Sequence, residues 1–333
     1  MEQPGRGQVV TFYSFQGGTG RSMALANVAL ILAMNGKRVL IVDWDLEAPG
    51  LHRFLEPFLD ADYVVRQSGV IDLLREYEDE VVHGAESIAE KIRRVAAVER
   101  HTIGVSWGFP GPGRLSLLTA GRQNSSYSPA LGERDWDRFF EDLHGVDFLE
   151  ALRDDMRASY EYTLIDSRAG LSDVVDICTQ HLPDVLVDCY SLSNQAIDGA
   201  VRTAYAVARY ARRGEPTRRI KILPVAMRVD HAVPRRADSG RRVAELAFSG
   251  LPHGVLDTEQ IRYPASVEIP YRAEYAFEET LAVFGDAPGD PESLLASYER
   301  LTEVITDGEV RSCPPLNSDE RLRVLRRCAR TPR

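Results

Sequence analysis

Short apolar runs alternate with longer segments of helical composition along most of the 333-residue chain. The apolar runs predict strands at Val9–Phe15, Arg38–Val42, Leu115–Leu118, Tyr162–Ile165, Val185–Tyr190, Ile220–Ala226 and Val267–Tyr271. The segments between and after them predict helices at Ser22–Asn35, Val70–Val82, Ser87–Val98, Trp136–Leu143, Val146–Ser159, Gln195–Arg213, 236–250, Ala276–Phe284 and Pro291–Thr306. Because strands that alternate with helices build parallel sheets, we expect an α/β fold with a mostly parallel, doubly wound sheet flanked by helices.

A glycine-rich stretch lies between the first predicted strand and the first predicted helix. Its residues 12–22 read Phe-Tyr-Ser-Phe-Gln-Gly-Gly-Thr-Gly-Arg-Ser, and Gly36 is placed to end the helix that follows. Glycines let successive backbone N–H groups converge on one anion, and a helix N-terminus adds partial positive charge. We therefore expect this loop to cradle the phosphates of a nucleotide, through Gln16, Gly17, Gly18, Thr19, Gly20, Arg21, Ser22 and Met23.

Acidic residues follow two of the predicted strands. Asp43 and Asp45 come after Arg38–Val42, and Asp166 comes after Tyr162–Ile165. Open parallel sheets bind ligands beyond the carboxyl ends of their strands, so these carboxylates are expected near the phosphates. Since Mg²⁺ prefers oxygen ligands and keeps several waters, we expect a Mg²⁺ site formed by Ser22, Asp43 and Asp166.

The order of these motifs resembles the MinD/ParA group of P-loop ATPases, whose deviant Walker A loop reads K-G-G-x-G-K-[ST]. This chain has Gln16 and Arg21 at the two lysine positions, and it resembles the K-G-G-V-G-R variant ATPases of that group at the second one. The resemblance extends over about residues 8–308 by motif order. It implies ATP and Mg²⁺ as cofactors and a homodimer that forms face to face across two nucleotides.

The resemblance also implies roles for individual residues. Asp45, the second acid of a D-x-D pattern, would position the attacking water, and Arg21 would be the catalytic cation at the phosphates. Residues 166–170, Asp-Ser-Arg-Ala-Gly, resemble a D-[ST]-x-x-G switch in which the backbone N–H of Gly170 senses the γ-phosphate. Arg168 within this switch is open to three interpretations: a cation for phosphate, a bridge to a partner chain, or an ordinary surface side chain.

The residues expected to contact the base lie further along the chain. The strand Ile220–Ala226 is followed by Met227, Arg228, Val229 and Asp230, at the place where this class of proteins reads the base. The guanine-reading motif [NT]-K-x-D is matched only at Asp230, so we favour adenine over guanine. We expect base contacts from Met227 and Arg228, and from Pro270 and Tyr271 in a loop that closes over the base.

Composition and charge narrow the possible partners and the domain organisation. Hydrophobic residues make up 44% and charged residues 27% of the chain, as in ordinary globular proteins. The net charge of −10 gives little support for nucleic-acid binding. No signal-peptide layout is found, and no apolar run approaches the roughly 20 residues that span a bilayer, so we expect a cytoplasmic protein. We expect one P-loop domain over residues 1–308 with an insertion at about 52–160.

The last residues, 309–333, have a different character. The segment Ser312–Asn317 contains two prolines and predicts a linker, and a basic tail follows it. We expect this tail to be disordered or bound to a partner. Membrane contact through it is not expected, because it carries few large apolar residues.

These features together predict an ATP-binding molecular switch with slow Mg²⁺-dependent hydrolysis that controls dimerisation or the binding of an unidentified protein partner. Three alternatives stay open. The first is a catalytically weak or inactive nucleotide-sensing assembly module, because Gln16 is neutral and Arg21 replaces a lysine. The second is a phosphotransferase, disfavoured by the absence of tyrosine in Glu309–Arg333. The third is a DNA-partitioning ATPase, disfavoured by the net charge.

Overall fold

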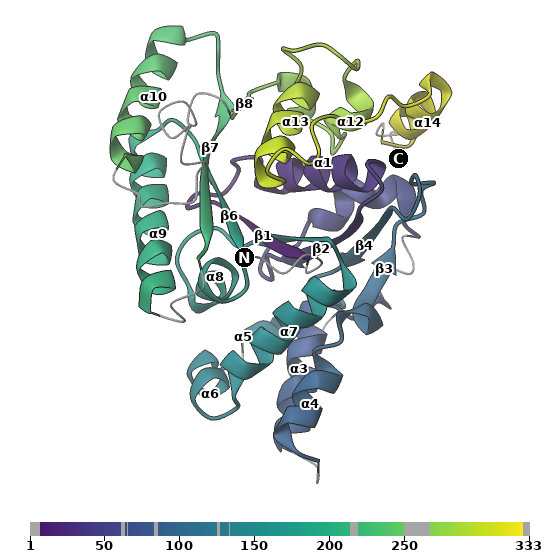
Figure 1. Cartoon of the computed structure of the whole chain (residues 1–333), viewed down its shortest axis with the longest axis vertical. Coiled ribbons are helices and arrows are strands. Elements are labelled where there is room, and N and C mark those ends of the chain that lie inside the picture. Colours follow the sequence, from purple (N-terminus) through teal and green to yellow (C-terminus); the bar gives the residue numbers. More distant parts are fainter. Residues whose placement is uncertain are drawn as a thin grey trace.

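The computed structural model describes residues 7–60, 64, 66–82, 86–124, 127–132, 134–213, 219–249 and 267–328. An eight-stranded sheet runs through its centre in the order β3-β4-β2-β5-β1-β6-β7-β8 (Figure 1). The strands are β1 (Gln8–Tyr13), β2 (Arg38–Trp44), β3 (Thr102–Gly104), β4 (Arg114–Leu118), β5 (Tyr162–Ser167), β6 (Val185–Tyr190), β7 (Lys221–Val229) and β8 (Glu268–Pro270). All neighbours pair in parallel except β3, an edge strand that pairs antiparallel with β4 and was not predicted. The expected mostly parallel α/β fold is confirmed.

Helices cover both faces of this sheet. One face carries α1 (Arg21–Met34), the 3-10 helix η1 (Leu51–Phe58), α12 (Ala282–Gly285), α13 (Leu294–Ile305) and α14 (Ser318–Cys328). The other face carries two groups of helices. The first group packs against β2, β4 and β5 and consists of α3 (Val70–Val82), α4 (Ile88–Val95), η2 (Val98–His101), α6 (Trp136–Glu141) and α7 (Gly145–Ser159). The second group packs against β6 and β7 and consists of α9 (Asn194–Arg213) and α10 (Pro234–Phe248). Shorter elements are α5 (Tyr127–Gly132), α8 (Asp173–Asp176), the π-helix η3 (Ile177–His181) and η4 (Ala273–Ala276).

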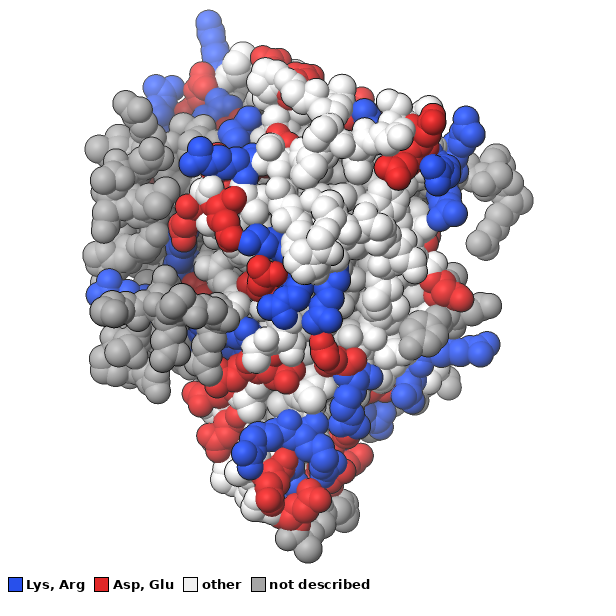
Figure 2. Space-filling view, turned by 45° about the vertical axis from the view of Figure 1, so that its right-hand side comes forward, with Lys and Arg blue, Asp and Glu red and all other residues white. Residues whose placement is uncertain are grey.

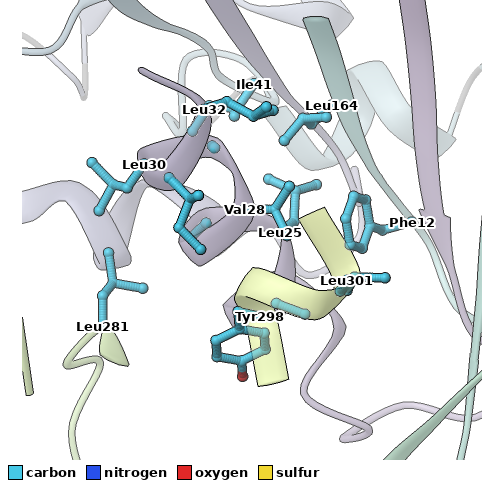
Figure 3. Close-up of a cluster of buried hydrophobic side chains, with 14 of the residues drawn as sticks. Phe12, Leu25, Val28, Leu30, Leu32, Ile41, Leu164, Leu281, Tyr298 and Leu301 are labelled. Carbon is cyan, nitrogen blue, oxygen red and sulfur yellow. The ribbon is translucent and has the colours of Figure 1, made fainter. Parts of the chain in front are cut away.

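Helix α1 lies between the sheet and α13 (Figure 3). Nearly every side chain of this helix is buried, because one side packs on the strands and the other on α13. A helix that is apolar all round belongs in a core of this kind. The contacts visible in Figure 3 involve Phe12, Leu25, Val28, Ile41, Leu164, Leu281, Tyr298 and Leu301. The N-terminus of α1, which follows the glycine-rich loop, is therefore held in a fixed position.

The positive φ of +81° at Gly36 ends α1, as predicted from the sequence. The predicted helix 236–250 is found as α10, with residue 250 outside the described residues. The segment of the expected insertion, about 52–160, supplies β3 and β4 as well as the helices below them in Figure 1.

Two expectations about the C-terminal part are wrong. The predicted helix Ala276–Phe284 is not continuous: the chain forms η4 and α12 instead, and the ring of Tyr275 packs closely against Gly285. The tail is not disordered in its described part, because α14 packs on α12 and η1 with Val324 buried. Arg321 donates to the carbonyl oxygens of Phe284 and Gly285, so polar contacts hold a helix with few apolar residues. Residues 329–333 lie outside the described part.

The surface carries both signs of charge. Basic side chains on the face shown in Figure 2 lie beside acidic ones, most densely toward its lower end. Among the described helices, none combines the length and apolar character needed to cross a membrane.

Candidate functional site

The glycine-rich loop connects β1 to α1 at the carboxyl edge of the sheet. Gly20 has a φ of +88° and caps α1, and Gly18 has a φ of +73°, so both use the left-handed region that favours glycine. A Cβ added to Gly17 or Gly18 would meet no heavy atom within 4 Å. The exposed backbone at this pair therefore leaves room for a ligand at the helix N-terminus, as a phosphate-binding loop requires.

The Arg21 side chain is buried and bonded to three residues around the end of the sheet. Its Nε lies 2.6 Å from Oδ1 of Asp166, its Nη2 lies 3.1 Å from Oδ2 of Asp45, and its Nη1 lies 3.3 Å from Oγ of Ser14. Burial alone would lower the pKa of Arg21, and the charges of Asp166 and Asp45 more than reverse this. The loop cation is thus tied to two of the acids predicted for the metal and the attacking water.

The predicted acids come together because β2 and β5 are neighbours. Asp43 is in register with Asp166, and both side chains lie on the α1 face, because they alternate with residues that pack on the opposite face. Oδ2 of Asp43 accepts hydrogen bonds of 3.1 Å from the backbone N–H groups of Gly50 and Leu51. Burial, and then the neighbouring charge of Asp166, raise the pKa of Asp43 to about 8. Burial also raises the pKa of Asp45, although Arg21 opposes this effect.

The donor set fits a divalent cation that is completed by water and phosphate. Oδ1 of Asp43 is buried and has no hydrogen-bond partner among the described residues. Asp45 and Asp166 share the guanidinium of Arg21, and Asp43 is in register with Asp166 without an ion pair of its own among the described residues, so an added positive charge would be favoured there. Within the described residues, no group of three His, Cys, Asp or Glu side chains is arranged to hold a metal by itself. Ser22 and the phosphates would therefore have to complete the predicted Mg²⁺ site.

Two loops follow the strands that carry these acids, β2 and β5. We call residues 45–50 the switch I loop and residues 167–171 the switch II loop. They are joined by an ion pair in which Nη2 of Arg168 lies 2.5 Å from Oε2 of Glu47. This ion pair lies within the chain, so it is neither the phosphate contact nor the bridge to a partner chain that we considered for Arg168, and both stay predictions.

Both backbone polar groups of Gly170 are engaged. Its N–H donates to the carbonyl of Ser14 at 3.3 Å, and its carbonyl accepts from the hydroxyl of Tyr13 at 2.9 Å. The group predicted to sense a γ-phosphate is therefore bonded to the protein in this conformation.

The predicted base-binding residues also lie beside the glycine-rich loop. Nη1 of Arg228 donates to the carbonyl of Gly18 at 2.8 Å, and its guanidinium lies 4.9 Å from the centre of the Tyr271 ring. A Cβ on Gly20 would lie 3.8 Å from side-chain atoms of both Met227 and Arg228.

The backbone at this edge explains how these side chains are placed. Arg228 has a φ of +53°, a costly conformation that is common at functional sites. Pro270 is buried and pairs with Val229. Asp230 is exposed and accepts from the N–H of Ala232 at 2.9 Å, so it caps a turn.

Reasoning from the sequence missed two participants, Tyr13 and Ser14. Tyr13 and Ser14 end an apolar strand, and nothing in their spacing indicates polar contacts with the switch II loop. Their position directly before the glycines is the one available signal, because residues there lie near the place where phosphates are expected to bind.

No protein-family model matches the chain, and no curated protein sequence matches it. Solved structures match it in fold. An ATP complex of a McdA variant from Cyanothece has a TM-score of 0.58 at 14% identity and covers 94% of this chain and 99% of that chain. MinD from Pyrococcus horikoshii with Mg-ADP has a TM-score of 0.57 at 16% identity, covering 90% of this chain and 95% of that chain. The pNOB8 ParA structure has a TM-score of 0.56 at 17% identity, covering 96% and 99%. The chain therefore has a MinD/ParA-like P-loop ATPase fold, as the order of its motifs indicated.

Proposed function

We propose that this protein is an ATP-binding molecular switch with slow Mg²⁺-dependent hydrolysis that controls homodimerisation or the binding of a protein partner. The observation that carries the proposal is the position of Arg21. The first residue of the helix after the glycine loop reaches two strand-end acids, Asp166 and Asp45, that come from different parts of the chain. Binding a nucleotide phosphate and a divalent cation, and orienting an attacking water, all require charged or polar side chains at this edge of the sheet. The solved structures of the same fold include an ATP complex and a Mg-ADP complex, which supports this choice of ligand.

In this proposal, each residue of the site has a defined task. The backbone of Gln16–Gly20 and the N-terminus of α1 bind the phosphates, while Ser22, Asp43 and Asp166 hold Mg²⁺ through oxygen atoms and water. Bound Mg²⁺ supplies positive charge that neutralises the phosphate oxygens. Because Arg21 is bonded to Asp166 and Asp45, nucleotide binding exchanges these contacts for contacts with phosphate, which frees both acids. Asp45 then orients the attacking water.

The proposal is tested first by binding. Arg21→Ala should weaken ATP binding by about 1.5–3 kcal/mol, the range for hydrogen bonds to charged groups, or roughly tenfold to a hundredfold. Isothermal titration calorimetry with ATP and Mg²⁺ measures this effect. Arg93→Ala, which removes an exposed arginine on α4, is the matched control and should bind ATP like the wild type. Unchanged ATP affinity in Arg21→Ala would sink the proposed phosphate site.

A nucleotide-sensing module without useful turnover is the second candidate, and the neutral side chain of Gln16 favours it. An amide at this position offsets less of the charge that develops during phosphoryl transfer than a lysine would. Gln16→Lys should raise the turnover of ATP by at least roughly tenfold and strengthen ATP-dependent dimerisation. Asp45→Ala, the companion variant, should bind ATP and lose hydrolysis. A wild type that binds ATP, shows no multiple turnover and gains none from Gln16→Lys would establish the sensing module instead.

A further inference from the structure

Tyr13 connects the switch II loop to helix α9 through a single oxygen atom. The side chain is fully buried at the end of β1. Its hydroxyl donates to the carbonyl of Gly170 at 2.9 Å and accepts from Oγ1 of Thr203 at 3.2 Å. Burial raises the pKa of Tyr13 to about 12, so the hydroxyl keeps its proton and remains a donor near neutral pH.

The switch II loop is held by hydrogen bonds to both the backbone N–H and the backbone carbonyl of Gly170. While Tyr13 holds the carbonyl of Gly170, the carbonyl of Ser14 accepts from the Gly170 N–H at 3.3 Å. Gly170 has a φ of +87°, and a Cβ added to it would meet nothing within 4 Å. The loop is thus attached to the end of β1 by hydrogen bonds, with open space on the Cβ side of Gly170.

Helix α9 is fixed to the same segment by packing. A Cβ added to Gly199 would lie 2.2 Å from the ring of Phe15, so the helix approaches the start of the glycine-rich loop as closely as glycine allows. Thr203 lies one helical turn after Gly199 and is 5% exposed. The contacts with Phe15 and Tyr13 therefore hold this turn of α9 against the junction of strand and loop.

We propose that Tyr13 is a positioning residue that holds the switch II loop in its resting conformation and couples the release of this loop to helix α9. The inference rests on the proposed function. In this proposal the N–H of Gly170 leaves Ser14 when it turns to a γ-phosphate, and the accompanying movement of the loop also breaks the bond between the Tyr13 hydroxyl and the carbonyl of Gly170. ADP has no γ-phosphate and leaves both bonds intact. The Tyr13 hydroxyl therefore opposes the binding of a triphosphate and not that of a diphosphate.

The test is the ratio of two affinities in the full chain. Tyr13→Phe removes the hydroxyl and keeps the ring, and calorimetry measures the affinities for AMP-PNP and ADP in the presence of Mg²⁺. We expect AMP-PNP to bind about threefold to tenfold more tightly than to the wild type, as for the loss of one neutral hydrogen bond in the resting state. The affinity for ADP should not change.

The chain offers a matched control. Tyr77 is another fully buried tyrosine whose hydroxyl donates to a backbone carbonyl, that of Leu143, and it lies among α3, α6 and α7 away from the switch loops. Tyr77→Phe should leave both affinities unchanged. Thr203→Val should shift the affinity ratio in the same direction as Tyr13→Phe, and the double variant should show less than the sum of the two effects.

The wild type provides an independent measurement if Tyr13→Phe does not fold. Hydrogen exchange in residues 167–171 and 199–206 should change together on adding AMP-PNP and stay constant on adding ADP. An affinity ratio equal to that of Tyr77→Phe, or exchange that changes in one segment alone, would overturn the role of Tyr13. A wild type that binds neither nucleotide would instead remove the proposed function on which this role depends.

Discussion

Two buried aspartates flank β1, one on each neighbouring strand, and their surroundings differ completely. Asp166 on β5 lies opposite Phe12 on the face covered by α1, and Arg21 bonds to it at 2.6 Å. Asp188 on β6 lies opposite Tyr13, and its side chain alternates with those of the α1 face, so it points toward α9. Neither carboxylate oxygen of Asp188 has a hydrogen-bond partner among the described residues.

The difference shows two ways of burying a carboxylic acid. Asp166 lies beside a permanent cation, and this pair stands where a phosphate and Mg²⁺ are proposed to bind. Burial raises the pKa of Asp188 well above its ordinary value, because it favours the uncharged form of this acid. The ion pair of Arg21 and Asp166 therefore lies on the α1 face, where a ligand can exchange with it, whereas burial disfavours a charge on Asp188 on the α9 face.

The largest effect is expected from removing the cation beside Asp166. Arg21→Met should lower the free energy of unfolding by about 3 kcal/mol, because a buried carboxylate is left without its partner. Asp166→Asn on this background should restore part of the loss, since the uncompensated charge is then gone. Urea denaturation of the four proteins of this cycle at pH 7 without nucleotide measures the coupling. Strictly additive effects would mean that the pair contributes nothing beyond its two side chains.

Replacing Asp188 is expected to change the free energy of unfolding by a smaller amount and in the opposite direction. Because the pKa is raised in the folded state, folding takes up a proton at any pH between about 4 and the raised value. The contribution of Asp188 to the free energy of unfolding is largest at pH values below the pKa of this residue in the unfolded chain. It decreases by up to about 1.4 kcal/mol per pH unit as the pH rises toward the raised pKa of the folded state. Asp188→Val removes this dependence and should raise the free energy of unfolding at pH 7 by about 1–3 kcal/mol. The gain should shrink as pH falls toward 4, and a gain independent of pH would contradict a protonated Asp188.

The sequence predicted most of the fold because buried strands leave a strong local signal. The bounds of β6 and α3 agree with the predicted Val185–Tyr190 and Val70–Val82, where apolar runs are continuous or regularly spaced. The failures lie where tertiary contacts decide the structure. Helix α14 is held partly by arginine contacts with backbone carbonyls, and such contacts follow no periodicity in the sequence.

The sequence predicts where the candidate site lies, but it does not predict which side chains of the site contact each other. Parallel strands end at one edge, so Asp43 and Asp166 could be placed near the glycine-rich loop. The pairing of Arg21 with Asp166 spans 145 positions, and its geometry depends on side-chain packing that no local pattern encodes. Asp188 and Tyr13 lie in apolar runs that predict only buried strands. The polar contacts of such a residue depend on the three-dimensional neighbours of its polar atoms, which the sequence pattern does not give.

The smallest effect is expected at the ion pair between the two switch loops, which extends the comparison to the surface. The side chains of Arg168 and Glu47 are 34% and 50% exposed, so water already solvates both charges. Exposed pairs contribute about 0.2–1 kcal/mol, and Arg168→Ala should change the free energy of unfolding by no more than that.

Exchanging the charges, with Glu47→Arg and Arg168→Glu together, should restore the stability lost in either reversal alone. Urea denaturation at low and at high salt checks this, because the coupling of an exposed pair should decrease with added salt whereas the Arg21–Asp166 coupling should persist. A coupling as large and salt-insensitive as that of Arg21 would mean that the two switch loops are locked together and not loosely joined.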